Sequence, residues 1–250
     1  MTGRLDILGL GPGAAELVTP EVTAALRNAT DAVGYGPYLA RLPARPGLTL
    51  HATDNREEIA RATQALQMAA EGRHVAVVSS GDPGVFAMAA AVFEALEAGP
   101  PGWRALDIRV LPGISAMLAA AARAGAPLGH DFCAINLSDN LKPQDLIERR
   151  LRLAAEADFA IALYNPRSRA RPDLLDRALA ILRETCADAR PVLFARAVST
   201  PEEALRILPL PEARGDMADM RTLVIVGSST TRIIARDPLP PILYTPRRAP

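Results

Sequence analysis

The segment with the clearest capacity for chemistry is residues 79–84, Ser-Ser-Gly-Asp-Pro-Gly. It combines a carboxylate and two hydroxyls with glycines that allow close approach of a ligand, and its proline stiffens the turn. The apolar run 75–78 precedes it and the apolar run 85–93 follows it, which predicts a strand, a turn and a buried helix. Ligands of α/β proteins bind at such strand ends. The sequence therefore predicts a small-molecule site around Asp82.

A second glycine-rich turn, residues 9–13 (GLGPG), ends the first predicted strand, residues 5–10. The dinucleotide fingerprint GxGxxG fails here because position 14 is alanine and Pro12 intrudes. That fingerprint also needs a helix that opens at the last glycine, whereas the first helix signal comes at Thr19. A nicotinamide-dependent oxidoreductase is therefore only a distant alternative.

Strands alternate with helices along the whole chain, which predicts an α/β protein. Further strands are expected at 49–51, 75–78, 108–111, 132–136, 159–164, 191–195 and 222–226. Helices are expected from Pro20 to about Ala29 with Thr19 as N-cap, from a capping box at Asp54 and Glu57 to about Gly72, and at 85–93, 116–124, 143–156 and 172–185. These elements form two α/β lobes, residues 1–115 and 116–250, and the proline-rich tail is expected to be only partly ordered.

Composition narrows the function classes. The 28 Lys and Arg residues balance the 28 Asp and Glu residues, which disfavours a nucleic-acid binder that depends on a diffuse positive field. The longest apolar run, residues 85–93, is too short to span a bilayer, and the amino terminus has no signal-peptide pattern. The two cysteines form no CxxC motif and the three histidines are dispersed, so we expect no metal site. A cytoplasmic protein without nucleic-acid or membrane partners is predicted.

Six phrases resemble, in this order, those of the tetrapyrrole (corrin/porphyrin) methyltransferase family. They are residues 8–13 (LGLGPG), 16–19 (ELVT), 80–83 (SGDP), 111–116 (LPGISA), 162–166 (ALYNP) and 226–232 (VGSSTTR). The segments 34–39 (GYGPYL), 128–132 (LGHDF) and 164–168 (YNPRS) look most like one branch, the precorrin-3B C(17)-methyltransferases. Each phrase alone is weak, but the ordered set covers nearly the whole chain.

The resemblance implies a two-lobed fold in which each lobe is a mixed sheet flanked by helices. It also implies S-adenosyl-L-methionine in the trough between the lobes, and a homodimer. The implied cofactor contacts are Ser80, Gly81, Asp82, Ser115, Ala116, Tyr164, Asn165, Arg196, Ala197, Thr222 and Leu223. Gly11 and Pro12 would border the tetrapyrrole, and the turn 228–232 would lie near the cofactor.

The implied reaction methylates carbon 17 of precorrin-3B, with ring contraction to precorrin-4, in cobalamin biosynthesis. Positioning supplies much of the rate of such a transfer, and no catalytic triad is needed. A general base could assist the contraction, and Asp82, His130 and Asp131 are candidates. The sequence favours His130 as a loop or interface residue and Asp131 as an N-cap or turn residue over a catalytic role for either. Arg167 could hold a substrate carboxylate through its planar guanidinium, or could lie on a loop surface.

Other functions remain open from the sequence. The substrate could be cobalt-precorrin-3, because neither a metal-free nor a cobalt-containing macrocycle requires a protein ligand to the metal. Methylation could also occur at another precorrin carbon. A noncatalytic tetrapyrrole carrier with this fold is a more distant alternative, and binding of S-adenosylhomocysteine would distinguish it from an enzyme.

Overall fold

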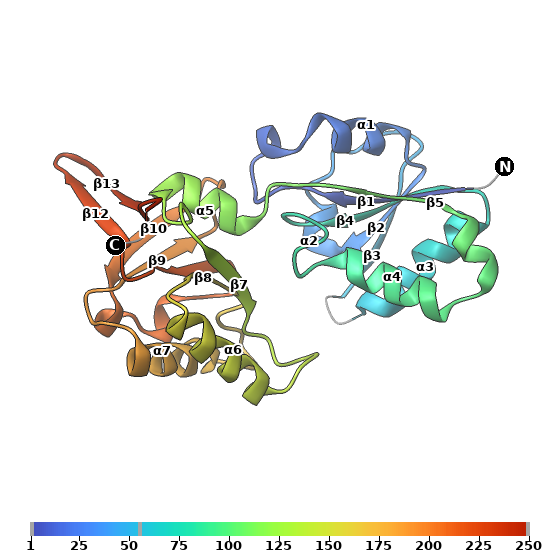
Figure 1. The fold of residues 1–250 in the computed structure, drawn as a ribbon. Coiled ribbons are helices and arrows are strands. Elements are labelled where there is room, and N and C mark those ends of the chain that lie inside the picture. Colours follow the sequence, from blue (N-terminus) through green and yellow to red (C-terminus); the bar gives the residue numbers. More distant parts are fainter. Residues whose placement is uncertain (1–2, 55–56, 249–250) are drawn as a thin grey trace. The chain divides into compact units, whose positions relative to one another are not determined.

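Residues 3–54 and 57–248 are described by the computed structural model of the chain. The chain divides into two compact units, Met1–Ser115 and Ala116–Pro250, called here the first and the second unit. Each unit contains a five-stranded sheet, and a small three-stranded sheet lies in the second unit (Figure 1). None of the helices in the described residues combines the length and the apolar character that crossing a bilayer requires.

The sheet of the first unit is parallel throughout, in the order β3-β2-β4-β1-β5. Its strands are β1 Arg4–Gly9, β2 Asp31–Tyr35, β3 Thr49–Thr53, β4 His74–Ser79 and β5 Asp107–Leu111. The expectation of a mixed sheet in each lobe is therefore wrong for this unit. Helices connect most successive strands, and each crossover returns the chain to the same edge of the sheet, so the strands stay parallel. All five carboxyl ends consequently meet at one edge.

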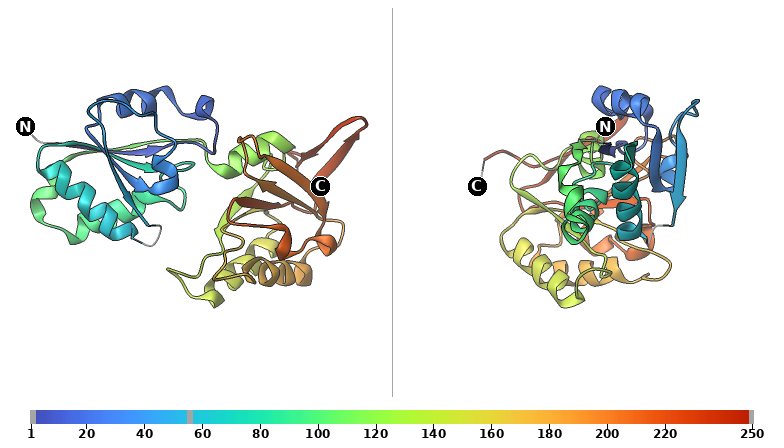
Figure 2. Two further views of the ribbon diagram at one scale, coloured as in Figure 1. Left: turned by 180° about the vertical axis from the view of Figure 1, so that it is seen from behind. Right: turned by 90° about the vertical axis from the view of Figure 1, so that its right-hand side faces the viewer.

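Helices cover both faces of this sheet. Helix α1, Pro20–Asn28, lies on one face, and α3, Glu58–Ala70, and α4, Met88–Ala98, lie on the other (Figures 1 and 2). The strand residues alternate accordingly: Leu5 and Ile7 pack with α3 and α4, and Leu8 packs with α1. The short helix α2, Gly36–Leu39, follows β2, and 3₁₀ turns occupy Ala15–Leu17 and Pro101–Ala105.

The N-termini of α1 and α3 can be compared with the caps predicted from the sequence. The Thr19 hydroxyl accepts a hydrogen bond from the Val22 amide at 3.2 Å, so the predicted N-cap of α1 is confirmed. The capping box at Asp54 and Glu57 is wrong, because α3 begins at Glu58 and its N-cap, Glu57, makes no side-chain capping bond. Residues 55 and 56, which fall inside that box, lie outside the described residues.

The helix predicted at residues 85–93 begins three residues later, at Met88. Phe86 has a positive φ of 53°, a conformation that a right-handed helix cannot contain. The turn around Asp82 is consequently longer than the apolar run suggested, and residues 82–87 form a loop.

The second unit has a mixed sheet in the order β10-β9-β11-β8-β7, in which only β7 and β8 are parallel. Its strands are β7 Phe132–Asn136, β8 Ala160–Tyr164, β9 Pro191–Arg196, β10 Ala204–Pro209 and β11 Thr222–Val226. Helices α6, Gln144–Glu156, and α7, Leu174–Thr185, pack on one face, where the main core of the unit forms. Helix α5, Ala116–Ala124, lies on the other face (Figure 1).

Four strands of the second unit, β6, β10, β12 and β13, were not expected from the sequence. Strand β10 pairs with β9 through a short connection, and the hairpin of β12, Arg232–Arg236, and β13, Leu239–Tyr244, pairs with β6, Gly125–Ala126. Two further 3₁₀ turns, Leu210–Glu212 and Gly215–Met217, precede β11. The hairpin projects from its unit (Figure 2). Much of the tail is thus strand, because backbone pairing compensates for its many prolines.

Candidate functional site

The loops that follow β1, β4 and β5 meet at the carboxyl edge of the first unit. We call residues 10–13, 80–84 and 112–115 the first-unit edge. Gly11 and Gly81 exchange two backbone hydrogen bonds, with N···O distances of 3.1 and 2.9 Å. Both have positive φ, 65° and 66°, which glycine adopts without strain. Two loops that are 70 residues apart in sequence are therefore joined backbone to backbone.

These loops can approach one another closely because the glycines in them have no side chains. A Cβ atom added to Gly113 would lie 2.2 Å from the Gly81 carbonyl oxygen, and one added to Gly9 would lie 2.6 Å from the same oxygen. Neither distance is sterically allowed, and the atom that would have to move is backbone. Glycines after three different strands thus set the shape of this edge.

Asp82 joins two of these loops through its carboxylate. Its Oδ1 accepts the Gly84 amide at 2.8 Å, and its Oδ2 accepts the Gly113 amide at 3.0 Å. Both oxygens of this half-buried residue are therefore occupied by backbone donors, which suits an orienting role better than proton transfer. Ser80 donates weakly to the Gly11 carbonyl oxygen at 3.5 Å, and Ser115 is buried where the loop after β5 ends.

The sequence analysis missed one residue that contacts the first-unit edge. Arg41 directs its guanidinium at the carbonyl oxygens of Leu10, Gly11 and Gly13. No motif pointed to it, because three of its partners are backbone carbonyl oxygens, which carry no sequence signature; the fourth is the Ser80 hydroxyl.

The second unit brings its predicted cofactor residues together at one edge of its sheet. Strand pairing places Thr222 opposite Arg196, Leu223 opposite Ala195, and Val224 opposite Leu163. The end of β8, the end of β9 and the start of β11 therefore coincide, and the Met117 amide of α5 donates to the Tyr164 hydroxyl at 3.2 Å. We call this group the second-unit edge: Ala116, Tyr164, Asn165, Arg196, Ala197, Thr222 and Leu223.

Two residues of the second-unit edge have left-handed backbone. Asn165 has φ 51° and Ala197 has φ 48°. Such a conformation is unfavourable for alanine, and strain of this kind gathers at functional sites. The Asn165 amide also donates to Asn136 Oδ1 at 3.0 Å, which ties the segment after β8 to the end of β7.

Arg196 and Thr222 share a carboxylate partner that the sequence analysis did not identify. Asp219 Oδ2 accepts Arg196 Nε at 2.8 Å, and Asp219 Oδ1 accepts the Thr222 hydroxyl at 2.7 Å. Burial alone would raise the pKa of Asp219, but the hydrogen bonds from Thr222, Arg196 and the Arg221 amide outweigh it and lower the pKa. The Arg196 side chain is thus engaged, and its backbone lies in the sheet between β10 and β11.

His130 lies at the opposite edge of the second unit's sheet. It precedes β7, while Tyr164 ends β8 and Asn165 follows it, and these parallel strands of five residues span about 16 Å. His130, Asp131, Asp158, Ser228 and Thr230 help to line a small cavity of about 120 Å³ there. Within this unit the structure therefore separates His130 and Asp131 from the second-unit edge.

The turn at residues 228–232 also belongs to this opposite edge, away from the second-unit edge. The Ser229 amide and hydroxyl donate to the Asp158 carboxylate at 2.8 and 2.5 Å, and Arg190 adds a contact of 2.8 Å. Burial opposes ionisation of Asp158, but these contacts lower its pKa. The anion that this turn holds is thus a side chain of the same unit.

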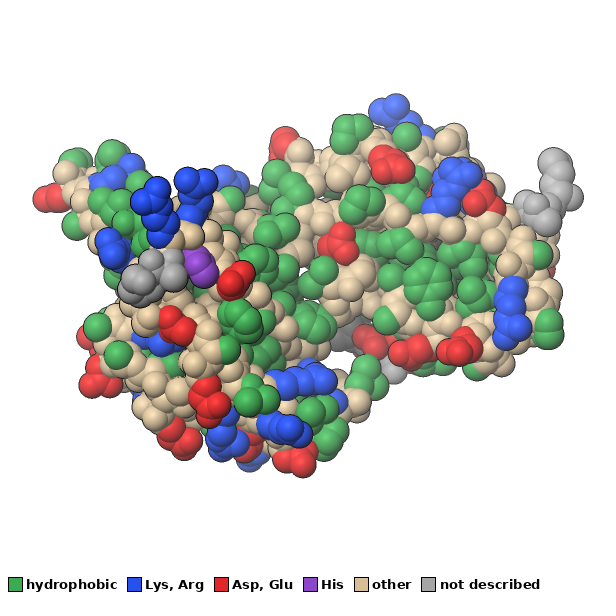
Figure 3. All heavy atoms as spheres, in the orientation of Figure 1, with side chains coloured by type: hydrophobic (Ala, Val, Ile, Leu, Met, Phe, Trp, Pro, Cys, Tyr) green, Lys and Arg blue, Asp and Glu red, His purple; other side chains and the backbone are tan. Residues whose placement is uncertain are grey.

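Arg167 follows the second-unit edge and is half-buried. No ion pair of the described residues involves it, whereas its neighbour Arg171 pairs with Asp139. On the face shown in Figure 3, positive and negative side chains are interspersed over both units. Arg167 is therefore a cation whose charge is available to a ligand.

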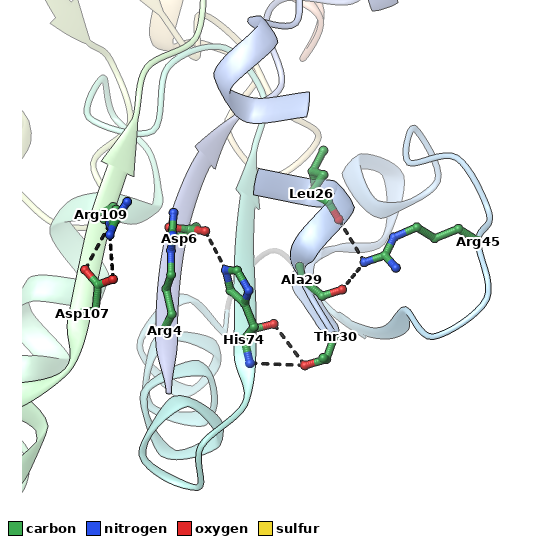
Figure 4. A network of polar contacts seen from close by, with 9 residues as sticks. All are labelled: Arg4, Asp6, Leu26, Ala29, Thr30, Arg45, His74, Asp107 and Arg109. Carbon is green, nitrogen blue, oxygen red and sulfur yellow. Dashed lines mark hydrogen bonds and ion pairs between the residues drawn. The ribbon is translucent and has the colours of Figure 1, made fainter. Parts of the chain in front are cut away.

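The remaining histidines pair with buried carboxylates of the first unit. His51 Nε2 lies 2.8 Å from Asp31. His74 Nε2 lies 3.0 Å from Asp6, a pair that Figure 4 shows. These pairs stand near the strand starts, away from the first-unit edge. Among residues 3–54 and 57–248, no cluster of three or more His, Cys, Asp or Glu side chains could hold a metal ion.

Comparisons with known proteins identify the family of this chain. The family model described as Tetrapyrrole (Corrin/Porphyrin) Methylases matches residues 4–214. A precorrin-3B C(17)-methyltransferase from Sinorhizobium sp. is 56% identical over 247 residues, which cover 99% of this chain and 97% of that protein.

Solved structures give the same result. The crystal structure of the methyltransferase CobJ matches with a TM-score of 0.94 and 64% identity, covering 98% of this chain and 100% of that chain. A uroporphyrin-III C-methyl transferase from Thermus thermophilus, complexed with S-adenyl homocysteine, shares the fold with a TM-score of 0.66 at 22% identity, covering 90% of this chain and 97% of that chain. The chain belongs to the tetrapyrrole (corrin/porphyrin) methylase family.

Proposed function

We propose that this protein is the S-adenosylmethionine-dependent methyltransferase of cobalamin biosynthesis that methylates carbon 17 of precorrin-3B, with ring contraction to precorrin-4. The observation that carries the proposal is the 56% identity, over almost both full lengths, to a precorrin-3B C(17)-methyltransferase. The first-unit and second-unit edges support it, because each gathers residues that the resemblance assigns to ligand binding.

S-Adenosylmethionine is the proposed methyl donor, and both edges fit it chemically. The first-unit edge offers the Asp82 carboxylate, and the second-unit edge offers the hydroxyl, amide and backbone groups of Tyr164, Asn165, Ala197 and Thr222. When bound, the cofactor supplies an electrophilic methyl group on a positively charged sulfur. Ser80, Gly81, Ser115, Ala116, Arg196 and Leu223 complete the proposed contacts.

The chain's own residues contribute positioning rather than covalent chemistry. Rigid loops that hold two reactants in line can supply a large part of a rate enhancement. The first-unit edge is suited to this task because its loops are joined by the Gly11–Gly81 pair and by both oxygens of Asp82. Asp82 is accordingly proposed as an orienting residue of the cofactor site.

Substrate recognition is assigned to Gly11, Pro12 and Arg167. Precorrins carry acetate and propionate groups, and a guanidinium matches a carboxylate in a two-point contact. The unpaired state of Arg167 among the described ion pairs suits this role. In Arg167→Ala we expect weaker substrate binding with unchanged cofactor affinity. Equal precorrin affinity in the variant and the parent protein would remove Arg167 from the site.

Ring contraction expels carbon 20 as an acetyl group, and its hydroxyl must lose a proton. His130 is one candidate for the base. It lies at the opposite edge of its sheet, away from the second-unit edge, and this position does not favour a catalytic role. We expect His130→Ala to retain turnover between about pH 6 and 8. A loss of turnover in this variant would restore His130 as the base.

Assembly and location are also proposals. We infer a homodimer from the family resemblance, and a cytoplasmic location from the two cysteines, both of which are unpaired. Analytical ultracentrifugation at several protein concentrations tests the first of these.

The decisive experiment incubates the purified protein with precorrin-3B and S-adenosylmethionine labelled at the methyl carbon. We expect one labelled methyl group at carbon 17 and an acetyl group derived from carbon 20, identified by mass spectrometry and NMR. A parallel incubation with cobalt-precorrin-3 separates the cobalt-dependent alternative. Label at another carbon, or conversion of the cobalt substrate alone, would replace the proposed reaction.

A further inference from the structure

The sequence phrase 34–39 (GYGPYL) has a structural effect that the proposed function does not use. Gly34 lies so close to β4 that a Cβ atom there would come within 2.5 Å of Val78 Cγ2. The rings of Tyr35 and Tyr38 meet edge to face with centroids 5.3 Å apart. The Arg41 amide then donates to the Tyr38 carbonyl oxygen at 3.1 Å. Strand β2 and helix α2 together thus present Arg41 to the neighbouring loops.

The guanidinium of Arg41 collects acceptors from two loops of the first-unit edge. Nη2 donates to the carbonyl oxygens of Leu10 and Gly13 at 2.5 and 3.3 Å. Nη1 donates to the Gly11 carbonyl oxygen at 3.1 Å and to the Ser80 hydroxyl at 3.4 Å. Three carbonyl groups of one short loop therefore converge on a single cation.

This arrangement depends on the shape of the side chain. Converging carbonyl dipoles repel one another, and a cation with several donors stabilises them. Arginine has five donors in a planar fork, whereas lysine offers three from one nitrogen. Burial lowers the pKa of Arg41, so the protein keeps it at an energetic cost. The hydrogen-bond acceptors of the Arg41 guanidinium in the described residues are neutral oxygens rather than carboxylates. The side chain therefore stabilises the loop instead of forming an ion pair.

We propose that Arg41 is a positioning residue for tetrapyrrole binding, because its forked contacts fix the loop that carries Gly11 and Pro12 against Ser80. The inference rests on the proposed function, which assigns Gly11 and Pro12 to the substrate. Arg41 acts through this loop. Loss of the fork leaves the loop carbonyls partly unpaired, and the loop then samples other conformations before substrate binds.

The test compares Arg41→Lys with Arg41→Gln and with a matched control, Arg45→Lys. Arg45 belongs to the same connecting segment and also donates to backbone carbonyls, those of Leu26 and Ala29 at the end of α1 (Figure 4). Its substitution therefore removes a comparable fork at a place without a proposed ligand role. Each protein is examined for thermal unfolding, for affinity toward S-adenosylhomocysteine, for kcat and KM with precorrin-3B, and for amide hydrogen exchange of residues 10–18.

We expect Arg41→Lys and Arg41→Gln to raise KM for the precorrin about tenfold, the effect of losing one charged hydrogen bond. We expect kcat and S-adenosylhomocysteine affinity to change less than about threefold, within half of that free energy. Exchange of residues 10–18 should accelerate in both variants, while Arg45→Lys should change neither KM nor this exchange.

Two results would overturn the inference. Full recovery of KM in Arg41→Lys would show that charge alone suffices, and unchanged exchange of residues 10–18 would show that the fork does not order the loop. The proposed function fails separately. A parent protein that binds no S-adenosylhomocysteine and converts no precorrin contradicts that function, whatever the exchange data show for Arg41.

Discussion

The two edges are built by different means. At the first-unit edge, backbone meets backbone: Gly11 pairs with Gly81, Gly113 touches the Gly81 carbonyl oxygen, and a carboxylate and a guanidinium hold the loops. At the second-unit edge, side chains pair with one another, as Arg196 does with Asp219, and two residues that are not glycine adopt positive φ.

This difference has a physical consequence. Backbone-to-backbone contact leaves no space for even one added methyl group, and the contacting atoms cannot move independently of the strands. Side-chain pairs tolerate change better, because solvent and rotamer shifts compensate. We therefore expect substitutions at the first-unit edge to lower the free energy of unfolding more than substitutions at the second-unit edge.

The largest effect is expected from Gly113→Ala. The new Cβ atom would lie 2.2 Å from a backbone oxygen, so the loops after β4 and β5 must separate. We expect a loss of about 3 kcal/mol or more in unfolding free energy, at the upper end of overpacking costs. Chemical denaturation measures it. Gly36→Ala is the control, because a Cβ atom there meets nothing within 4 Å, and an equal loss in both variants would refute the steric argument.

The next effect concerns Asp82→Asn. The amide nitrogen of the new side chain would face one of the two backbone N–H groups that the carboxylate now accepts. We expect a loss of about 1–3 kcal/mol in stability, the cost of an unsatisfied partner. Asp145→Asn is the matched control, since within residues 3–54 and 57–248 Asp145 accepts one hydrogen bond, from the Leu146 amide, at an exposed position. Similar denaturation midpoints for the two variants would contradict the role of Asp82 in joining loops.

Ala197→Gly is expected to change stability less, and to raise it instead of lowering it. Glycine relieves the cost of φ 48° for alanine, about 1–2 kcal/mol, but adds about 0.5–1 kcal/mol of chain entropy loss. A net gain of about 0.5–1 kcal/mol should appear in denaturation curves. Ala122→Gly, within helix α5, should instead lose about 1 kcal/mol. Destabilisation of both variants alike would show that Ala197 is not strained.

The smallest effect is a pH dependence at Asp219. Its pKa is lower in the folded than in the unfolded protein, so its contribution to stability is present above about pH 4 and is lost as pH falls through the folded value. Asp219→Asn should therefore destabilise the protein near neutral pH and differ less from the parent protein toward pH 3. Thermal unfolding across this range checks it. A constant difference at all pH values would exclude the ionised carboxylate as the cause.

Much of the fold was predictable because burial imposes clear patterns. The strands expected at 132–136 and 222–226 coincide with β7 and β11, and the predicted family and two-lobed α/β fold are confirmed. These segments are short apolar runs between polar turns, a pattern with few competing structures. Strand β10 escaped prediction because most of its residues are exposed, and exposure removes the apolar pattern.

The details of the candidate site were less predictable because they depend on tertiary contacts. The continuous apolar run 85–93 concealed the break at Phe86, since a positive φ has no signature in a bulky residue. Arg41 has backbone partners, which any sequence could supply. His130 and the turn 228–232 lie in matching phrases, yet the sequence does not state which neighbouring strands run parallel, and hence which strand ends share an edge.

The central claim is that residues of the two edges bind a sulfonium methyl donor, and titration calorimetry with S-adenosylhomocysteine tests it most directly. We predict saturable binding to the folded parent protein, a loss of about tenfold or more in Asp82→Asn for the broken loop contact, and unchanged affinity in His130→Ala. Absence of binding to protein shown to be folded, or equal affinity in the parent protein and Asp82→Asn, would contradict the claim.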